Sequence, residues 1–252
     1  MDSPYSKAMN RFFAAKSNIK DNTIIITDKE DIYHIKKVLR LQADDRIIVS
    51  DQIQYEYVCR IKEMGPELLL EILEQNEFLR EPHIRVTLFQ GIPKQQKMEF
   101  VVQKCTELGL DTLVPVFMER TVVKDKGDYW KKVVRYQQIA EEAAKQSQRG
   151  VMPEVRQATT FMDMVERLSG FQLVLFPYEE EEETTIKEVL QGIEEGIKRI
   201  AIIIGPEGGF SKEEAEMIIG QGGIPLSLGK TILRTETAGM AALAMTMYEL
   251  EL

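Results

Sequence analysis

Residues 202–211 could bind a ligand through their backbone. They read Ile-Ile-Ile-Gly-Pro-Glu-Gly-Gly-Phe-Ser and run from an apolar strand through a glycine-rich loop to Ser211, which forms a capping box with Glu214 at a helix start. Ligands of open α/β sheets bind beyond the carboxyl ends of the strands, and glycine allows close backbone approach. A tight strand-to-helix turn would use the same glycines, so the loop alone leaves both interpretations open.

A second segment, residues 228–239, has the same order of strand end, loop and helix start. Arg234 lies inside this loop. Thr235 or Thr237 is a candidate to cap the helix that follows. That helix, residues 238–250, is rich in alanine and methionine, which suits a core helix or, in part, a dimer face.

Common nucleotide and metal sites do not explain these loops. Gly229-Lys230-Thr231 resembles the end of a P-loop, but Ile224 stands where that motif needs its first glycine, and no G-x-G-x-x-G occurs. The chain has two cysteines, Cys59 and Cys105, and two histidines, in a spacing that fits no metal motif. We therefore predict no metal site.

Apolar strands that alternate with helices must position both loops. The predicted strands of this region are 84–90, 112–117, 171–176, 199–204 and 224–228. The predicted helices are 95–108, 129–147, 161–168, 185–193, 211–219 and 235–250. This alternation predicts an α/β domain with a mostly parallel sheet over residues 84–252.

The first part of the chain, residues 1–76, predicts a small β-barrel. Asp28 is expected to cap a helix that runs toward Leu41. The β-rich runs around this helix are 23–27, 46–50, 55–61 and 68–73. Residues 77–83 are polar, contain a proline and are predicted to connect the two domains.

Charge and composition limit the possible partners and the cellular compartment of the protein. The net charge is −9, which alone argues against a nucleic-acid partner, but residues 91–149 carry 11 basic and 8 acidic side chains and could follow phosphates. No apolar stretch of about 18 residues indicates a membrane span. The opening residues lack the apolar core of a secretory signal, and the few cysteines suit a reduced compartment. We expect a cytoplasmic protein with no membrane partner.

The two loops together resemble the paired cofactor loops of the RsmE family, the 16S ribosomal RNA uracil-N(3)-methyltransferases of the SPOUT superfamily. The segments that carry the resemblance are MNRFF (9–13), HIKKVLRLQADD (34–45), QQKMEFVVQKCTELGL (95–110), AEEAAKQSQRG (140–150), IIIGPEGGFSKEE (202–214) and LGKTILRTETAGMAAL (228–243). They span nearly the whole chain in the family's order. Two residues depart from the pattern: Ala43 stands where glycine is common, and Lys145 where an acidic residue is common.

The resemblance implies a fold and an activity. It implies a PUA-like β-barrel at residues 1–76 and a SPOUT-type parallel-sheet domain with a deep trefoil knot at residues 84–252. The cofactor would be S-adenosyl-L-methionine, and the reaction would be methylation of N3 of a specific uridine in 16S rRNA of the small ribosomal subunit. The protein would be a homodimer with its active site near the subunit interface.

The resemblance also implies roles for single residues. The cofactor pocket would be lined by Phe176, Pro177, Ile204, Gly205, Gly208, Gly209, Leu228, Gly229 and Leu233. Arg234 would hold the uracil anion or a phosphate, and Glu207 or Glu236 would accept the N3 proton, although either could instead favour a helix N-terminus. RNA contacts would come from Arg11, Phe12, His34, Arg40, Lys94, Lys97, Lys104, Gln146 and Arg149.

Two other functions remain open from the sequence. The chain could be a SPOUT methyltransferase that acts on another RNA, or an RNA-binding accessory protein without catalysis. The intact glycines and Arg234 disfavour the second, because an inactive site need not keep them.

Overall fold

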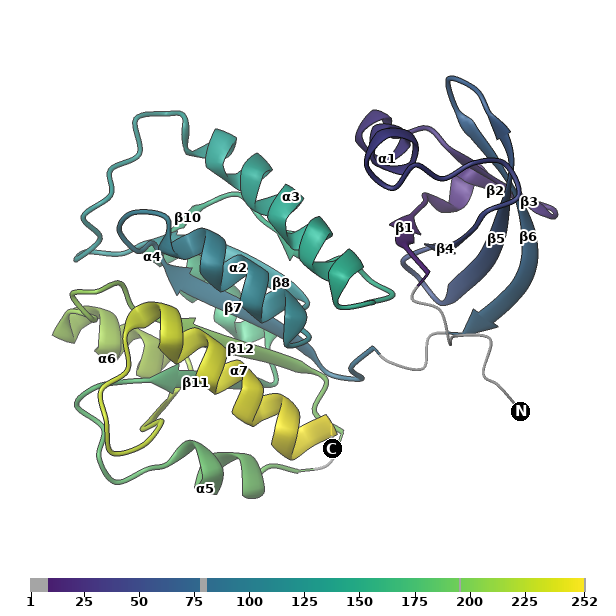
Figure 1. Ribbon diagram of the computed structural model, residues 1–252. Coiled ribbons are helices and arrows are strands. Elements are labelled where there is room, and N and C mark those ends of the chain that lie inside the picture. The colour runs from purple at the N-terminus through teal and green to yellow at the C-terminus, as the bar shows by residue number, and fades with distance from the viewer. Residues whose placement is uncertain (1–8, 78–80, 195, 252) are drawn as a thin grey trace. The chain divides into compact units, whose positions relative to one another are not determined.

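The computed structural model describes residues 9–77, 81–194 and 196–251, and the chain divides into two compact units (Figure 1). The first unit comprises the chain up to Glu81 together with Ala144–Met152, and the second comprises the rest. The domain bounds predicted from the sequence stay a prediction, and part of the predicted connector lies outside the described residues. Nothing in the sequence indicated that Ala144–Met152 would pack with the first unit.

A six-stranded mixed sheet forms the first unit. Its strands, in pairing order, are β1 (Arg11–Phe13), β4 (Arg46–Ser50), β5 (Tyr55–Met64), β6 (Leu68–Glu77), β3 (Thr23–Ile26) and β2 (Ile19–Lys20). β1 pairs with β4 in parallel, and the other neighbours are antiparallel. The pairing path is open at β1 and β2, so the described strands form a half-barrel. A short 3₁₀ helix, η1 (Lys16–Asn18), joins β1 to β2.

The predicted cap of the first helix is confirmed. The Asp28 carboxylate accepts hydrogen bonds from the backbone N–H groups of Glu30 and Asp31, each 2.9 Å long, at the start of α1 (Lys29–Tyr33). The helix continues as a π-helical turn, η2 (His34–Val38). A carboxylate at this position satisfies N–H groups that have no partner within the helix.

Polar contacts attach Ala144–Met152 to the rest of the first unit. The Lys145 ammonium lies 2.5 Å from Asp31 and also over the ring of Phe12. Arg149 pairs with Glu81 at 2.8 Å, and the Ser50 hydroxyl donates to the carbonyl of Gly150. The lysine that departs from the family pattern therefore anchors this segment to the first sheet.

A sheet of seven strands, all paired in parallel, forms the second unit. Its strands in pairing order are β10 (Thr159–Thr160), β8 (Thr112–Phe117), β7 (Arg85–Gly91), β12 (Arg199–Ile204), β11 (Leu173–Pro177) and β13 (Ile224–Leu226), with β9 (Glu154–Val155) also on β8. Because every pair is parallel, the carboxyl ends of these strands lie along one edge of the sheet. The predicted parallel α/β domain is confirmed.

Helices cover both faces of this sheet. One face packs against α2 (Lys97–Glu107), α3 (Tyr129–Gln146), α5 (Ile186–Gln191) and α7 (Thr235–Glu251). The other face packs against α4 (Phe161–Arg167), which the 3₁₀ helix η3 (Leu168–Gly170) extends, and α6 (Lys212–Gly220). α7 also contacts α2 and α5 directly. Alternate strand residues enter the two cores, with Leu88 on the first face and Phe89 on the second, as a strand period of two requires.

The predicted strands agree closely with the strands of the structure where a strand is buried on both faces and its sequence is a long apolar run. Thr112–Phe117 and Arg199–Ile204 are confirmed to the residue. β13 ends at Leu226, earlier than predicted, because the backbone of Ser227 bonds to Thr184 and Ile186 and no longer to β11. The short strands β1, β2, β9 and β10 were not predicted.

Both cysteines are fully buried, and burial raises the pKa of the Cys59 and Cys105 thiols to about 12. They are therefore protonated packing residues. No helix in the described ranges is long and apolar enough to cross a membrane. The trefoil knot stays a prediction.

Candidate active site

Two loops and one helix start meet at the carboxyl edge of the parallel sheet. The first, the glycine loop (residues 205–210), follows β12, and the second, the arginine loop (residues 227–234), follows β13 and leads into α7. β7 pairs with β12, so the start of α2 after β7 lies at the same edge. Open parallel sheets bind ligands at such an edge.

The glycine loop has little room for side chains. A Cβ on Gly205 would lie 2.9 Å from the ring of Phe210, and one on Gly209 would lie 2.0 Å from a carboxylate oxygen of Glu179. Gly209 also has φ +67°, which favours glycine. The loop ends in the predicted capping box, in which Ser211 and Glu214 each bond the other's backbone N–H.

A buried hydrogen-bonded bridge joins β7, the glycine loop and α7. The hydroxyl of Thr235 donates to the carbonyl of Gly205 at 2.5 Å, and the side-chain amide of Gln90 donates to the same hydroxyl at 2.9 Å. Gln90 is fully buried, and Thr235 is 7 % exposed. Gly239 makes room for this arrangement, because a Cβ there would lie 3.1 Å from the other amide atom of Gln90. We call this the threonine bridge.

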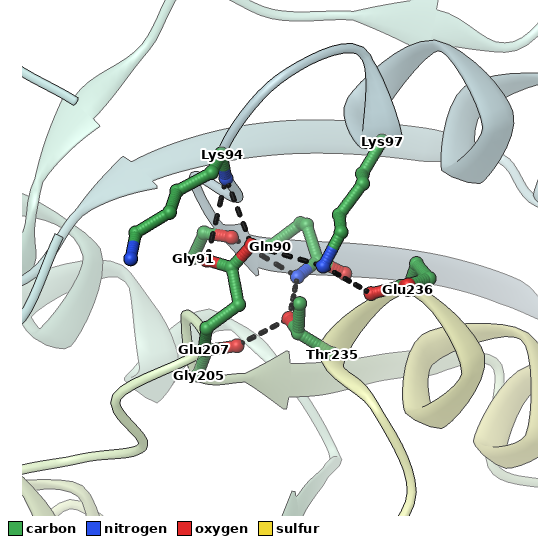
Figure 2. A network of polar contacts seen from close by, with 8 residues as sticks. All are labelled: Gln90, Gly91, Lys94, Lys97, Gly205, Glu207, Thr235 and Glu236. Atoms are coloured by element: carbon green, nitrogen blue, oxygen red, sulfur yellow. Dashed lines mark hydrogen bonds and ion pairs between the residues drawn. The ribbon is translucent and has the colours of Figure 1, made fainter. Parts of the chain in front are cut away.

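An ionic bridge joins the same elements closer to the surface (Figure 2). The Lys97 ammonium lies 3.1 Å from a carboxylate oxygen of Glu207 and 3.2 Å from one of Glu236. Glu207 also accepts the backbone N–H of Lys94 at 3.0 and 3.3 Å. The side chains of Lys97, Glu207 and Glu236 are 28, 26 and 14 % exposed, so the bridge is partly desolvated. We call it the lysine bridge.

The lysine bridge sets the charge state of its members. Burial alone would raise the pKa of Glu207, but the Lys94 and Glu207 N–H groups and the Lys97 ammonium outweigh it and lower that pKa. The hydrogen bond to Glu207 and the pairing with Glu236 raise the pKa of Lys97 despite some desolvation. Glu207 is therefore held ionised, and a carboxylate so stabilised accepts a proton poorly.

The structure brings the predicted catalytic residues to one edge. Glu207 lies in the glycine loop, Arg234 ends the arginine loop, and Glu236 lies in the first turn of α7. Arg234 is exposed, and its guanidinium has no partner among the residues that the structure describes. Within the described chain, Arg234 is thus a cation without a partner at the edge that also holds two engaged carboxylates.

The residues predicted to bind cofactor all lie at this edge but differ in exposure. Phe176, Ile204 and Gly205 are buried; Phe176 stacks on Tyr178 and meets Phe210 edge-on. The partly exposed ones are Pro177, Gly209, Leu228 and Leu233, and the exposed ones are Gly208 and Gly229. Their contact with a cofactor stays a prediction.

The residues predicted to bind RNA are divided between the two units. In the first, Arg11 and Arg149 are buried and pair with Glu56 and Glu81, and Phe12 is buried in the core. Those exposed in the first unit are His34, Arg40 and Gln146. In the second, the side chain of Lys94 is exposed, Lys97 is held in the lysine bridge, and Lys104 pairs with Glu107.

Sequence reasoning did not single out Gln90 and considered Thr235 only as a helix cap. Gln90 ends an otherwise apolar strand, and a polar side chain in such a run must find a hydrogen-bond partner if it is buried. That signal indicates that a partner exists but does not identify it, because Thr235 follows 145 residues later.

Known proteins resemble this chain along its length. Residues 80–247 match the family model "RNA methyltransferase domain", and residues 26–73 match "RNA methyltransferase PUA domain". Ribosomal RNA small subunit methyltransferase E of Bacillus subtilis is 33% identical over 255 residues, with 97% of this chain and 98% of the relative covered. This chain belongs to the ribosomal RNA small subunit methyltransferase E family.

Solved structures agree with the family. A putative methyltransferase from Legionella pneumophila with bound SAM has TM-score 0.85 and 30% identity, covering 96% of this chain and 98% of that one. The family's enzyme from Neisseria gonorrhoeae, bound to S-adenosyl methionine, has TM-score 0.83 and 27% identity, covering 95% and 97%. The half-barrel and the parallel sheet are therefore the PUA-like and SPOUT-type domains that the sequence predicted.

Removing the Thr235 hydroxyl tests the threonine bridge. Thr235→Val removes the donor to the Gly205 carbonyl. It also removes one of the two acceptors of the Gln90 amide, which keeps only the Gly91 carbonyl among the described residues. We therefore expect the free energy of unfolding in urea to fall by about 1–3 kcal/mol. Thr246→Val is the matched control: this hydroxyl, also buried in α7, donates only to the helix carbonyl of Ala242, and its loss should cost less than about 1 kcal/mol. Equal losses in the two variants would contradict the bridge.

The lowered pKa of Glu207 predicts a pH-dependent stability. Its contribution is fully present above its ordinary pKa of 4.5 and is lost as pH falls through the lower pKa of the folded state. Glu207→Gln should therefore be less stable than the wild type near neutral pH, by at most about 1 kcal/mol for a partly exposed group, and the difference should vanish in acid. Urea unfolding across pH measures this.

Glu216→Gln is the control for that profile, because its side chain is 66% exposed and lies 3.9 Å from Lys212. It should follow the wild type at every pH. A wild-type advantage over Glu207→Gln that grows toward acid would have the wrong sign and would refute the assignment.

Proposed function

We propose that this protein transfers a methyl group from S-adenosyl-L-methionine to N3 of a specific uridine in 16S rRNA of the small ribosomal subunit. The observation that carries the proposal is that the glycine loop and the arginine loop reach one sheet edge, and that the guanidinium of Arg234, in the second loop, has no partner among the described residues. Membership of the small subunit methyltransferase E family supports the same activity.

The residues at this edge fit such a cofactor. Leu228 and Leu233 offer half-buried apolar surface, and Ile232 between them is 88% exposed, which suits the flat, weakly polar adenine. Gly229 has φ +139°, and apart from its chain neighbours no atom of the described residues lies within 4 Å of where a Cβ would stand, so its backbone is open to a ligand. The cofactor would be held by these residues together with Ile204, Gly205, Gly208, Gly209 and the end of β11, Phe176 and Pro177.

When bound, the cofactor supplies an electrophilic methyl group on a sulfonium. N3 of uracil carries a proton that must leave, and negative charge develops on the ring as it does. The guanidinium of Arg234, which no residue in the described part of the chain engages, would stabilise that charge or hold an adjacent phosphate. Glu207 is already engaged by two backbone N–H groups and Lys97, which leaves Glu236 as the better candidate to accept the proton.

The partners follow from the same assignment. The target is 16S rRNA within the small subunit, and the expected location is the cytoplasm, where that RNA is made and assembled. A homodimer is supported by α7, which exposes Met245 and Tyr248 beside a largely apolar groove of about 590 Å³ that α5 also lines. Pairing of two copies would remove this apolar surface from water.

Methylation of small subunits that lack the modification tests the proposal. With labelled S-adenosyl-L-methionine, the wild type should produce 3-methyluridine in 16S rRNA. Arg234→Ala should lower the rate by about 10²- to 10³-fold, as the loss of an anion-stabilising group does, while the cofactor still binds. Arg156→Ala, a surface arginine paired only with Glu154, is the control and should keep the wild-type rate.

Three outcomes would contradict the proposal in different ways. Label on a different nucleoside of 16S rRNA would mean that the methylated atom is not N3 of uridine. Label only on another RNA would favour a SPOUT enzyme of different specificity. An absence of cofactor binding by the wild type would favour a non-catalytic RNA-binding protein.

A further inference from the structure

We propose that Lys97 is a positioning residue of the methyl-transfer site, which holds the glycine loop and the start of α7 in register through the lysine bridge. The inference rests on the proposed function, because those elements are the ones assigned to the cofactor. It changes the role that the sequence indicated for Lys97, which was a contact to RNA.

The geometry of the bridge carries the inference. Lys97 lies in the first turn of α2, Glu207 lies 110 residues further along the chain, and Glu236 lies in α7. One ammonium lies 3.1 and 3.2 Å from the two carboxylates (Figure 2). A lysine ammonium has three N–H donors, so one group can bond both carboxylates and connect three segments of the chain.

A cation is needed at this point. Two carboxylate oxygens that both lie within hydrogen-bond distance of one nitrogen are neighbours, and without the nitrogen their charges would repel each other. The repulsion would act between the glycine loop and α7, the two elements that border the proposed pocket. Removing the ammonium should therefore open the pocket rather than unfold the domain, since the threonine bridge still joins the same elements below.

Neighbouring lysines differ in what they contact. The side chain of Lys94 points away from the carboxylates in Figure 2, and only its backbone N–H reaches Glu207. Lys104, further along α2, pairs with Glu107 on the same helix. Within the described chain, Lys97 is the lysine whose ammonium connects the two carboxylates.

The test uses full-length Lys97→Met, Lys97→Arg and the matched control Lys104→Met. Titration calorimetry gives the Kd for S-adenosyl-L-methionine without RNA, and steady-state assays on unmodified small subunits give kcat and KM. We expect Lys97→Met to weaken cofactor affinity about five- to tenfold, as the loss of one partly desolvated ion pair can do. Its kcat should fall while its KM for subunits stays at the wild-type value.

Two further variants separate positioning from general damage. Lys97→Arg keeps the charge and should recover most of the cofactor affinity. The double variant Lys97→Met/Glu236→Gln loses the ammonium and also one of the two repelling carboxylates. Its Kd for the cofactor should therefore lie closer to the wild-type value than the sum of the two single-variant effects predicts. Lys104→Met, which removes an ion pair of α2 that reaches neither loop, should bind the cofactor with the wild-type Kd.

Opposite results would overturn the inference. A wild-type cofactor Kd in Lys97→Met, together with a raised KM for subunits, would assign Lys97 to RNA instead. An equal loss of affinity in Lys104→Met would mean that any charge on α2 matters and the bridge does not. If the wild type itself fails to bind the cofactor, the proposed function fails and the inference fails with it.

Discussion

The hydroxyl of Thr235 accepts a hydrogen bond from Gln90 and donates one to the carbonyl of Gly205, and these two bonds decide where the loops of the site lie. A parallel sheet brings strand ends to one edge, but it does not fix the loops that leave them. The threonine bridge does so from within the core, where an unpaired polar group costs about 1–3 kcal/mol. These hydrogen bonds hold the glycine loop and the start of α7 against β7. Arg234 directly precedes Thr235, the residue that makes both bonds.

Closer to the surface than the threonine bridge, ion pairs add a second constraint on the same elements. The lysine bridge uses one ammonium for two carboxylates, and in the first unit Arg11 and Arg149 are also paired with carboxylates. Several cations that the sequence made available to RNA are thus engaged within the protein. Few free phosphate contacts mean limited non-specific affinity for RNA. The proposed target, a large and preformed ribosomal subunit, agrees with this limited affinity.

Much of the second unit could be predicted, because strands buried on both faces appear as apolar runs and helices between them appear as amphipathic stretches. The capping box of Ser211 and Glu214 and the loop positions follow from local rules of the same kind. The short strand β1 could not be predicted, since its three residues gain their structure by pairing with β4 more than thirty residues away. The attachment of Ala144–Met152 to the rest of the first unit depends on still more distant partners, because Lys145 and Asp31 are 114 residues apart and Gly150 and Ser50 are 100.

In the candidate site, too, local features could be predicted from the sequence and contacts between distant residues could not. Glycines and Arg234 were found because loop chemistry is local, whereas the role of Lys97 depends on two carboxylates that lie far along the chain. A lysine on a helix in a basic segment indicates an RNA contact when only the sequence is considered. Three-dimensional placement changes that interpretation because the ammonium is already satisfied by the protein.

Hydrogen–deuterium exchange with and without S-adenosyl-L-methionine tests most directly whether the two loops act as one pocket. We expect the cofactor to slow exchange in the glycine loop and the arginine loop together, over residues 205–210 and 227–234, while the half-barrel exchanges as before. Protection of only one loop, or protection confined to a different edge of the sheet, would contradict a pocket formed by both.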